Sequence, residues 1–355
     1  MKGKSKLDCI QYLRALAAAA VVVSHAGDSL LGHESHLINL EYGAYGVDMF
    51  FVVSGFIMLY TTIDTQIGPA TFLMKRLIRI FPLYFILSTA MFVLTRLHPA
   101  SFNRESPDAI AFLESIFFVP HWNPREHNLE PLIGQGWTLN YEMFFYLLFA
   151  GTLVLGQRFR GLFVLLPISA LVAVGQLHPI EVPAFITYTS PLLLEFGLGV
   201  ICAACLLTRR TALAQALLII LALLTVYLYA FHADSYRSET LRPLFIGAPC
   251  ALLMTVLVMV EGHAELPRIR PLILIGDASY SLYLVHGFVL GFGRRLWLRY
   301  FDITTLGSNL LFVIFILLAS IAVAIPLYRY IEVKLGRALS GLLTRREPST
   351  HRVPV

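Results

Sequence analysis

Charged residues are scarce in this chain of 355 residues, because Asp, Glu, Lys and Arg together make up only 14% of it. Soluble globular domains contain roughly 25% of these residues. Hydrophobic residues reach 57%, and the mean hydropathy is +0.72. A soluble fold of this size could not bury so many apolar side chains without exposing large apolar patches. The composition therefore excludes a soluble protein and predicts a polytopic membrane protein.

Cysteine is also rare, and no separate soluble domain or repeat of fixed period is visible. The four cysteines lie in or beside apolar runs, which argues against a disulfide framework. Cys202 and Cys205 form a CxxC without a second pair or a nearby histidine, so packing explains them better than a metal site. We expect one membrane domain over 1–335, followed by a short cytoplasmic tail over 336–355.

Apolar runs long enough to cross a bilayer define the fold class. A hydrocarbon core of ~30 Å needs about 20 apolar residues per helix. The sequence predicts an all-α bundle of about ten transmembrane helices, over 10–27, 44–61, 78–96, 138–155, 161–177, 186–206, 212–231, 243–260, 276–293 and 307–328. A Phe-rich stretch over 109–119 is too short to span and is predicted to lie on the membrane surface.

Basic residues between the predicted spans indicate the orientation. They alternate with acidic or mixed loops, and the positive-inside rule then places both termini in the cytoplasm. The basic residues that carry this argument are Lys2, Lys4, Lys6, Lys75, Arg76, Arg79, Arg158, Arg160, Arg209, Arg210, Arg268, Arg270, Lys334, Arg337, Arg345 and Arg346. Arg294, Arg295 and Arg299 oppose it, because this topology puts them outside.

Two ionisable residues occupy the first predicted span, QYLRALAAAAVVVSHAG over 11–27. Arg14 and His25 are eleven residues apart, so a helix presents them on nearly the same face, roughly 16 Å apart along its axis. Each has an ordinary explanation alone: Arg14 as a cation reaching the lipid interface, His25 as a helix-end residue touching water. Ionisable groups that share a face within a membrane usually line a functional path, which favours a functional role for His25.

Two carboxylates are predicted near the depth of His25. Asp48 lies about one turn inside the second span, and Glu142 lies about one turn inside the fourth. A carboxylate beside an imidazole fixes its tautomer and stabilises the imidazolium that forms when it removes a proton. His25, Glu142 and Asp48 are therefore candidate catalytic residues. Capping or pairing at a helix end explains Asp48 equally well, whereas the aromatic surround of Glu142 favours a functional role. Glu195 is a further intramembrane carboxylate without a predicted partner.

Two further groups of residues suggest binding sites. Arg76 and Arg79 share a helical face in TFLMKRLIRIFPLYF over 71–85, where they act either as lipid-facing topology signals or as a clamp for a phosphorylated cytoplasmic ligand. The ninth span, GDASYSLYLVHGF over 276–288, is unusually polar. Interhelical hydrogen bonds or a substrate channel account for its polarity. The channel candidates are Trp137, Tyr280, Ser281 and His286.

These segments occur in an order that resembles the type-three membrane acyltransferase family. The resemblance covers nearly the whole chain and includes GVDMFFVVSGF, RLIRIFPLYF, WTLNYEMFFY and GDASYSLYLVH. It implies a bacterial inner-membrane protein, of the short single-domain branch found with exopolysaccharide synthesis. It also implies that Arg14 and His25 are needed for activity and that Arg76 and Arg79 take part in using the donor.

The implied reaction is transfer of an acyl group, most simply from acetyl-CoA, to a hydroxyl of an extracytoplasmic or lipid-linked saccharide. Acetyl-CoA is then a co-substrate, and no permanently bound cofactor or metal is expected. The donor phosphates are predicted beside Arg76, Arg79 and Arg14, with the thioester near His25. His25 acts either as a general base for direct transfer or as a nucleophile that forms an acyl-enzyme.

The expected partners are acyl-CoA, the saccharide acceptor, the lipid bilayer and the polysaccharide synthesis machinery, with no nucleic acid. A proton-coupled transporter is the main alternative, because ten spans with intramembrane His, Asp and Glu also suit proton-coupled export. A purely structural subunit of a polysaccharide synthase is a second alternative, but it leaves the alignment of Arg14 and His25 unexplained.

Overall fold

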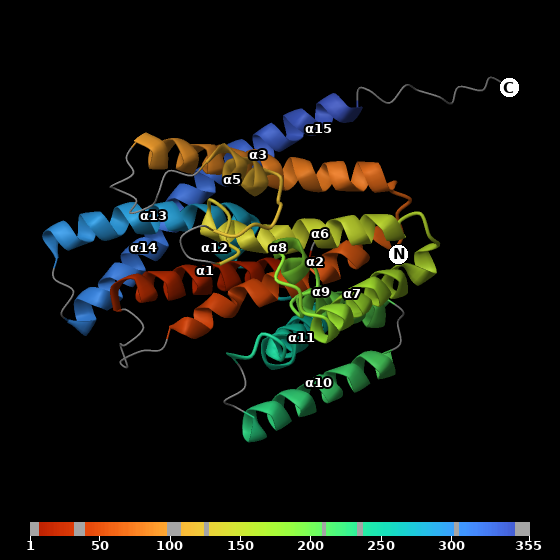
Figure 1. The fold of residues 1–355 in the computed structure, drawn as a ribbon. Helices are drawn as coiled ribbons and strands as arrows, with labels where there is room; N and C mark the ends of the chain where they lie inside the picture. The colour runs from red at the N-terminus through yellow and green to blue at the C-terminus, as the bar shows by residue number, and fades with distance from the viewer. Residues whose placement is uncertain are drawn as a thin grey trace.

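The computed structural model describes residues 7–31, 40–97, 108–123, 128–207, 211–232, 237–301 and 305–344. Within these ranges the chain forms helices and no strands. Most of the long helices run roughly along one direction, and α14 and α15 cross them (Figure 1). The predicted all-α bundle is thus confirmed, whereas Lys2, Lys4, Lys6, Arg209, Arg210 and the tail beyond 344 lie outside the described residues.

The helices follow one another along the chain with short connections. Their bounds are α1 Asp8–Leu31, η1 Glu41–Tyr45, α2 Gly46–Thr62, α3 Pro69–Leu97, α5 Ala109–Ile116, η2 Gly134–Gly136, α6 Trp137–Thr152, η3 Gln157–Phe159, α7 Arg160–Leu177, α8 Pro183–Tyr188, α9 Leu193–Leu207, α10 Thr211–Phe231, η5 Pro243–Gly247, α11 Ala248–His263, α12 Arg270–Asp277, α13 Ser279–Tyr300, α14 Leu306–Leu327, η6 Tyr328–Leu335 and α15 Gly336–Thr344. Every predicted span is mostly helical, although the span over 186–206 is interrupted between α8 and α9, and α5 covers most of the predicted surface segment.

Fewer of the described helices can span a membrane than the ten that the sequence predicts. Among the described helices, seven are long and apolar enough to cross a membrane, and α12 with α13 makes an eighth if this pair is one span bent by 73°. The helix over the fourth predicted span, α6, has only 16 residues. The figure of ten spans and the cytoplasmic placement of the termini therefore remain predictions.

Large apolar side chains stay exposed on the outer helices. Leu223 on α10 is 64% exposed and Leu311 on α14 is 60% exposed. Contiguous apolar surfaces of this kind are unusual on soluble monomers but are what lipid covers in a membrane protein. Together with the long apolar helices, they identify a multi-pass membrane protein.

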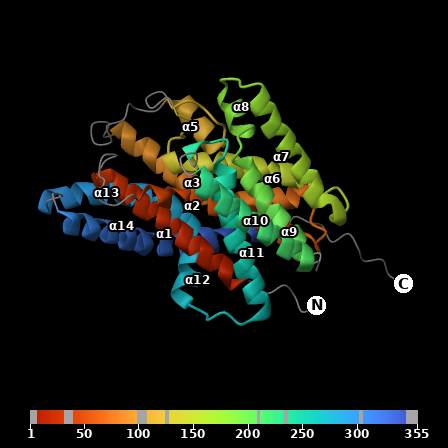
Figure 2. The same ribbon diagram turned by 90° about the horizontal axis from the view of Figure 1, so that it is seen from below.

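The first helix lies near the middle of the bundle. It packs against α2, α12, α13 and α14 (Figure 2). Its small residues Ala15, Ala17 and Ala18 are buried, and such residues let neighbouring membrane helices approach closely. At its C-terminal end, the Ser29 carbonyl accepts a hydrogen bond from Arg294 Nε at 2.9 Å. Arg294 therefore lies at the His25 end of α1.

Two glycines set the spacing of α2 and α9. A Cβ on Gly55 would lie 2.0 Å from the Phe196 carbonyl oxygen, and one on Gly199 would lie 2.0 Å from that of Val52. Each helix thus presents a glycine to the backbone of the other. Only glycine permits this contact without moving a helix.

We expect Gly55→Ala to destabilise the protein by about 1–3 kcal/mol, because the added methyl group forces the two backbones apart. Thermal unfolding of the purified protein in detergent measures this loss. Gly151→Ala in α6 is the matched control, because a Cβ there meets nothing within 4 Å. Equal stability of the two variants would contradict the close packing of α2 and α9.

Candidate active site

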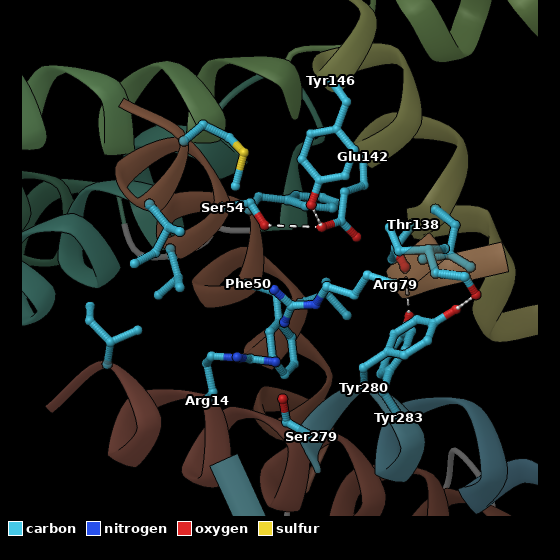
Figure 3. A pocket seen from close by; sticks show the side chains of 18 of the residues that line it. Arg14, Phe50, Ser54, Arg79, Thr138, Glu142, Tyr146, Ser279, Tyr280 and Tyr283 are labelled. Carbon is cyan, nitrogen blue, oxygen red and sulfur yellow. Dashed lines mark hydrogen bonds between the residues drawn. The ribbon is translucent and has the colours of Figure 1, made fainter. Parts of the chain in front are cut away.

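A cavity between α1, α2, α3, α6 and α13 contains two arginines (Figure 3). We call it the basic cavity; its lining includes Arg14, Phe50, Ser54, Arg79, Glu142 and Tyr280. The side chains of Arg14 and Arg79 extend into the same space. Arg14 is half-buried, and Arg79 keeps an exposed side chain although it lies between helices.

The two guanidinium groups have few partners in the protein. Arg14 makes one long hydrogen bond, 3.4 Å from Nη1 to Gln11 Oε1. Arg79 makes no hydrogen bond or salt bridge to any residue in the described part of the chain. Arginine binds carboxylate and phosphate oxygens with two parallel N–H groups. The basic cavity therefore has unused capacity to bind an anion.

The carboxylate of Glu142 belongs to this cavity and not to the His25 region. It accepts hydrogen bonds from Ser54 Oγ at 3.2 Å and from the Tyr146 hydroxyl. The predicted shared depth of Glu142 and His25 is therefore wrong. The reason lies before α6: the segment ahead of this helix enters the bundle, where Gln135 Nε2 lies 3.4 Å from His286 Nε2. One turn into α6 is consequently already at the level of Arg14.

Of the two arginines predicted in RLIR, only Arg79 lines the basic cavity. The Arg76 guanidinium lies over two aromatic rings, 5.3 Å from the centroid of Phe72 and 5.6 Å from that of Tyr146. Its Nε atom is buried and finds no hydrogen-bond partner among the described residues. Arg76 thus packs beside the cavity, against the tyrosine that binds Glu142.

His25 lies in a second cavity at the other end of α1. We call it the histidine pocket; its lining includes His25, Asp28, Glu130, Gln135, Trp137 and Arg242. Val47 and Tyr283 line both the histidine pocket and the basic cavity. The two cavities therefore meet at these two side chains. The Tyr283 hydroxyl also accepts a hydrogen bond from Thr138 Oγ1 at 3.2 Å.

The partner of His25 is a second histidine. His25 Nδ1 lies 2.9 Å from His286 Nε2, and the rings stack with centroids 5.1 Å apart and an interplanar angle of 14°. His286 is fully buried, and its Nδ1 lies 2.6 Å from the Tyr283 carbonyl oxygen. The sequence indicates that His286 is polar and intramembrane, but its pairing with His25 depends on tertiary structure.

This chain of contacts fixes the tautomer of His25. A carbonyl oxygen only accepts, so His286 Nδ1 carries a proton and, in the neutral ring, Nε2 accepts. His25 must then donate from Nδ1. In neutral His25, Nε2 is therefore unprotonated, which is the state that a general base requires.

Asp48 is paired with an arginine. Its two oxygens accept hydrogen bonds from Arg242 Nε and Nη2, both at 2.8 Å, and Asp48 is fully buried. The Arg242 guanidinium also lies over the Tyr45 ring, 5.1 Å from its centroid. Asp48 is thus positioned to hold Arg242 in the wall of the histidine pocket and not to orient the imidazole. The pair joins residues 194 apart in the sequence, and spacing does not predict such a contact.

Buried ion pairs lose most when one partner is removed, because the remaining charge is desolvated and unpaired. We expect Arg242→Gln to destabilise the protein by about 3–5 kcal/mol. The double variant Asp48→Asn, Arg242→Gln should recover most of this loss. Thermal unfolding of the three proteins measures it, and a double variant less stable than Arg242→Gln would argue against the pair.

The remaining channel candidates divide between the cavities and the core. Trp137 lines the histidine pocket, and Tyr280 lines the basic cavity, where its hydroxyl donates to the Ile80 carbonyl at 2.8 Å. Ser281 is fully buried, and its hydroxyl and backbone N–H both donate to Glu332. Glu332 therefore satisfies the first turn of α13 after the bend, a capping role rather than a channel role.

The basic cavity and the histidine pocket adjoin inside a bundle of membrane helices. This arrangement is typical of membrane-embedded proteins whose reactive groups lie inside the bundle. A family model described as an acyltransferase domain matches residues 7–329, so the chain belongs to the type-three acyltransferase family. This membership favours acyl transfer over the transporter alternative.

The chain is similar to three bacterial proteins. The chain is 34% identical to the exopolysaccharide production protein ExoZ of Rhizobium meliloti, over 70% of this chain and 77% of that protein. It is 25% identical to acyltransferase MdmB of Streptomyces mycarofaciens, over 97% of this chain and 94% of that protein. A 28% identity to nodulation protein 10 of Rhizobium leguminosarum bv. viciae covers 42% of this chain and 44% of that protein. No solved structure matches the chain.

Proposed function

We propose that this protein transfers an acyl group, most simply acetyl from acetyl-CoA, to a hydroxyl of a saccharide outside the cytoplasm, and that it does so in the bacterial inner membrane. The observation that carries the proposal is the contact between two cavities at Val47 and Tyr283. One cavity presents two arginines with unused donors, and the other presents a histidine nitrogen free to accept a proton. The similarity to an exopolysaccharide production protein supports a saccharide acceptor.

The donor enters the basic cavity in this proposal. Arg14 and Arg79 bind phosphate oxygens of the acyl-CoA, and its extended arm reaches past Tyr283 towards His25. Arg76 lies one turn from Arg79 on α3 but is turned onto aromatic rings. We therefore assign the direct phosphate contacts to Arg14 and Arg79.

His25 alone carries the proton in the proposed chemical step. His25 Nε2 removes the proton from the acceptor hydroxyl, whose oxygen attacks the thioester carbonyl. The carbon–sulfur bond then breaks, and the proton on His25 passes to the departing thiolate. His286 holds Nδ1 of the same ring throughout. In the two-step variant, Nε2 itself attacks the thioester carbonyl, and the carbon–sulfur bond breaks to release the CoA thiolate and leave an acyl-histidine. The acceptor oxygen then attacks this acyl group, the nitrogen–carbon bond breaks, and the hydroxyl proton passes to the thiolate.

The test is a transfer assay with the purified protein, acetyl-CoA labelled in the acetyl group, and deacylated exopolysaccharide fragments from the producing strain. We expect label in the saccharide and free CoA in equal amounts. Label that remains in acetyl-CoA while intact saccharide crosses a proteoliposome membrane would instead identify a transporter. Acyl-protein trapped in the wild type but absent in His25→Ala would select the two-step variant.

The donor assignment makes its own prediction. Arg79→Gln should raise the KM for acetyl-CoA about tenfold to 100-fold, because a charge-assisted hydrogen bond contributes roughly 1.5–3 kcal/mol. Arg268→Gln is the control, because Arg268 is a 72% exposed arginine that pairs with Asp8 outside the cavity. Initial rates at varied acetyl-CoA measure both. An unchanged KM in Arg79→Gln would remove the donor from the basic cavity.

A further inference from the structure

A third cavity shares lining residues with the histidine pocket and shares none with the basic cavity. We call it the outer groove, and it lies between the segment before α6, the connection from α7 to α8, and the segment before η5. Glu130, Trp137 and Arg242 line both the outer groove and the histidine pocket. The two spaces are therefore neighbouring parts of one site.

Both spaces are large enough to hold a ligand unit of their own. The histidine pocket has a volume of about 600 Å³ and the outer groove about 710 Å³. Small-molecule sites span roughly 300–1,000 Å³. A single sugar that presents its hydroxyl to His25 leaves the outer groove empty, so the arrangement suits an acceptor that extends beyond the acylated residue.

The lining of the outer groove suits a sugar. Trp122 lines the groove and is 43% exposed, and indole faces pack against the C–H face of a pyranose. Asn140 and Gln176 add side-chain amides, which donate to and accept from hydroxyl groups. Asn140 is only 3% exposed, and its side-chain oxygen accepts no hydrogen bond from the described residues. This buried acceptor in the groove wall points to a ligand that brings an O–H donor.

The charged side chains that line the outer groove affect which saccharides it can bind. Glu181 and Glu239 line the outer groove and are exposed, and the charge of Arg242 is neutralised by the two hydrogen bonds to Asp48. Two exposed carboxylates on one groove repel an anionic ligand such as the diphosphate of a nucleotide sugar. The groove therefore favours an uncharged saccharide residue.

We infer that the acceptor is a neutral oligosaccharide that occupies two adjacent subsites, with the acylated residue in the histidine pocket and its neighbour in the outer groove. The inference rests on the proposed function, which leaves the size and charge of the acceptor open. It places substrate selection in Trp122 and Asn140, away from the groups that move protons.

The experiment compares acceptors of graded length. Purified protein receives labelled acetyl-CoA and neutral fragments of one, two and four to eight residues, prepared by partial hydrolysis of the deacylated exopolysaccharide; UDP-glucose is the anionic acceptor. We expect kcat/KM to rise about tenfold or more from one residue to two, and UDP-glucose to be the poorest acceptor. Trp122→Ala should lower kcat/KM for the longer fragments about tenfold, and so reduce the gain from the second residue.

Phe117→Ala is the matched control. Phe117 is an aromatic residue that, like Trp122, follows α5; it is 64% exposed and does not line the outer groove. The Phe117→Ala protein should show the same rise of kcat/KM with fragment length as the wild type. Equal kcat/KM for one and two residues, or UDP-glucose as the best acceptor, would overturn the inference and leave the proposed function intact. No transfer to any acceptor would overturn the proposed function itself. A Trp122→Ala protein that unfolds is replaced by Asn140→Leu, with the same expected loss of length dependence.

Discussion

We expect His25→Ala to lower the rate of acyl transfer by at least about 100-fold, because a positioned general base contributes roughly 10²–10⁴. The reason is geometric: His25 lines the histidine pocket, which meets the basic cavity at Val47 and Tyr283, and in the neutral ring its Nε2 is unprotonated while Nδ1 is held by His286. The rate is measured as labelled acetyl incorporated into saccharide under saturating donor. The donor KM should stay within a few-fold, because in the proposed mechanism the phosphates bind at Arg14 and Arg79, away from His25.

Controls separate lost chemistry from lost folding. His25→Ala must show the thermal unfolding temperature and membrane insertion of the wild type. His25→Gln, which retains a polar side chain but cannot take up the proton, should be as inactive as His25→Ala. A folded His25→Gln with the wild-type rate would remove His25 from the chemistry and, with it, the mechanism proposed above.

The second large effect is expected at His286, which acts through His25. His286→Leu should lower the transfer rate on the order of 100-fold, because the loss of the acceptor at Nε2 frees His25 to rotate and to exchange tautomers. Its buried position also predicts lower stability, so activity is compared at a temperature where both proteins are folded.

Rescue by a conservative variant distinguishes orientation from packing. His286→Gln has a side-chain oxygen that can accept the proton of His25 Nδ1, so it should recover most of the activity that His286→Leu loses. His286→Asn, with its shorter side chain, should recover less. Equal activity of the Leu and Gln variants would show that His286 only fills space.

The helices were predictable because each rests on a local property. A run of about 20 apolar residues must satisfy its backbone hydrogen bonds internally within a membrane, and the helix does so regardless of its neighbours. For the same reason Arg14 and His25 were predictable as residues of one helix face. The structure places them in two cavities that meet.

Partners and depths were not predictable, because they depend on contacts between distant segments. Glu142 was misplaced because the segment before α6 enters the bundle, and no local pattern marks that entry. His286 and Arg242 lie 261 and 194 residues from their partners His25 and Asp48. A buried aspartate needs a cationic partner, so a partner for Asp48 could be expected. The sequence does not indicate which of its many arginines is that partner.

The bend between α12 and α13 shows the same limit. The sequence predicts one span over 276–293, whereas the helix direction changes by 73° at its first residues. Glu332 takes up the hydrogen-bond donors at the start of α13, from a helix 51 residues further along the chain. A remote acceptor of this kind replaces the local capping residue that a sequence pattern would have revealed.

Acyl transfer in proteoliposomes tests the central claim most directly, because the claim is that donor and acceptor approach His25 from opposite ends of one bundle. The neutral oligosaccharide is sealed inside the vesicles with the protein in the membrane, and labelled acetyl-CoA is added outside. The mechanism predicts label in the trapped saccharide, no transfer with His25→Ala, and no leakage of saccharide or acetyl-CoA. Label that forms only when donor and acceptor share one compartment would contradict it.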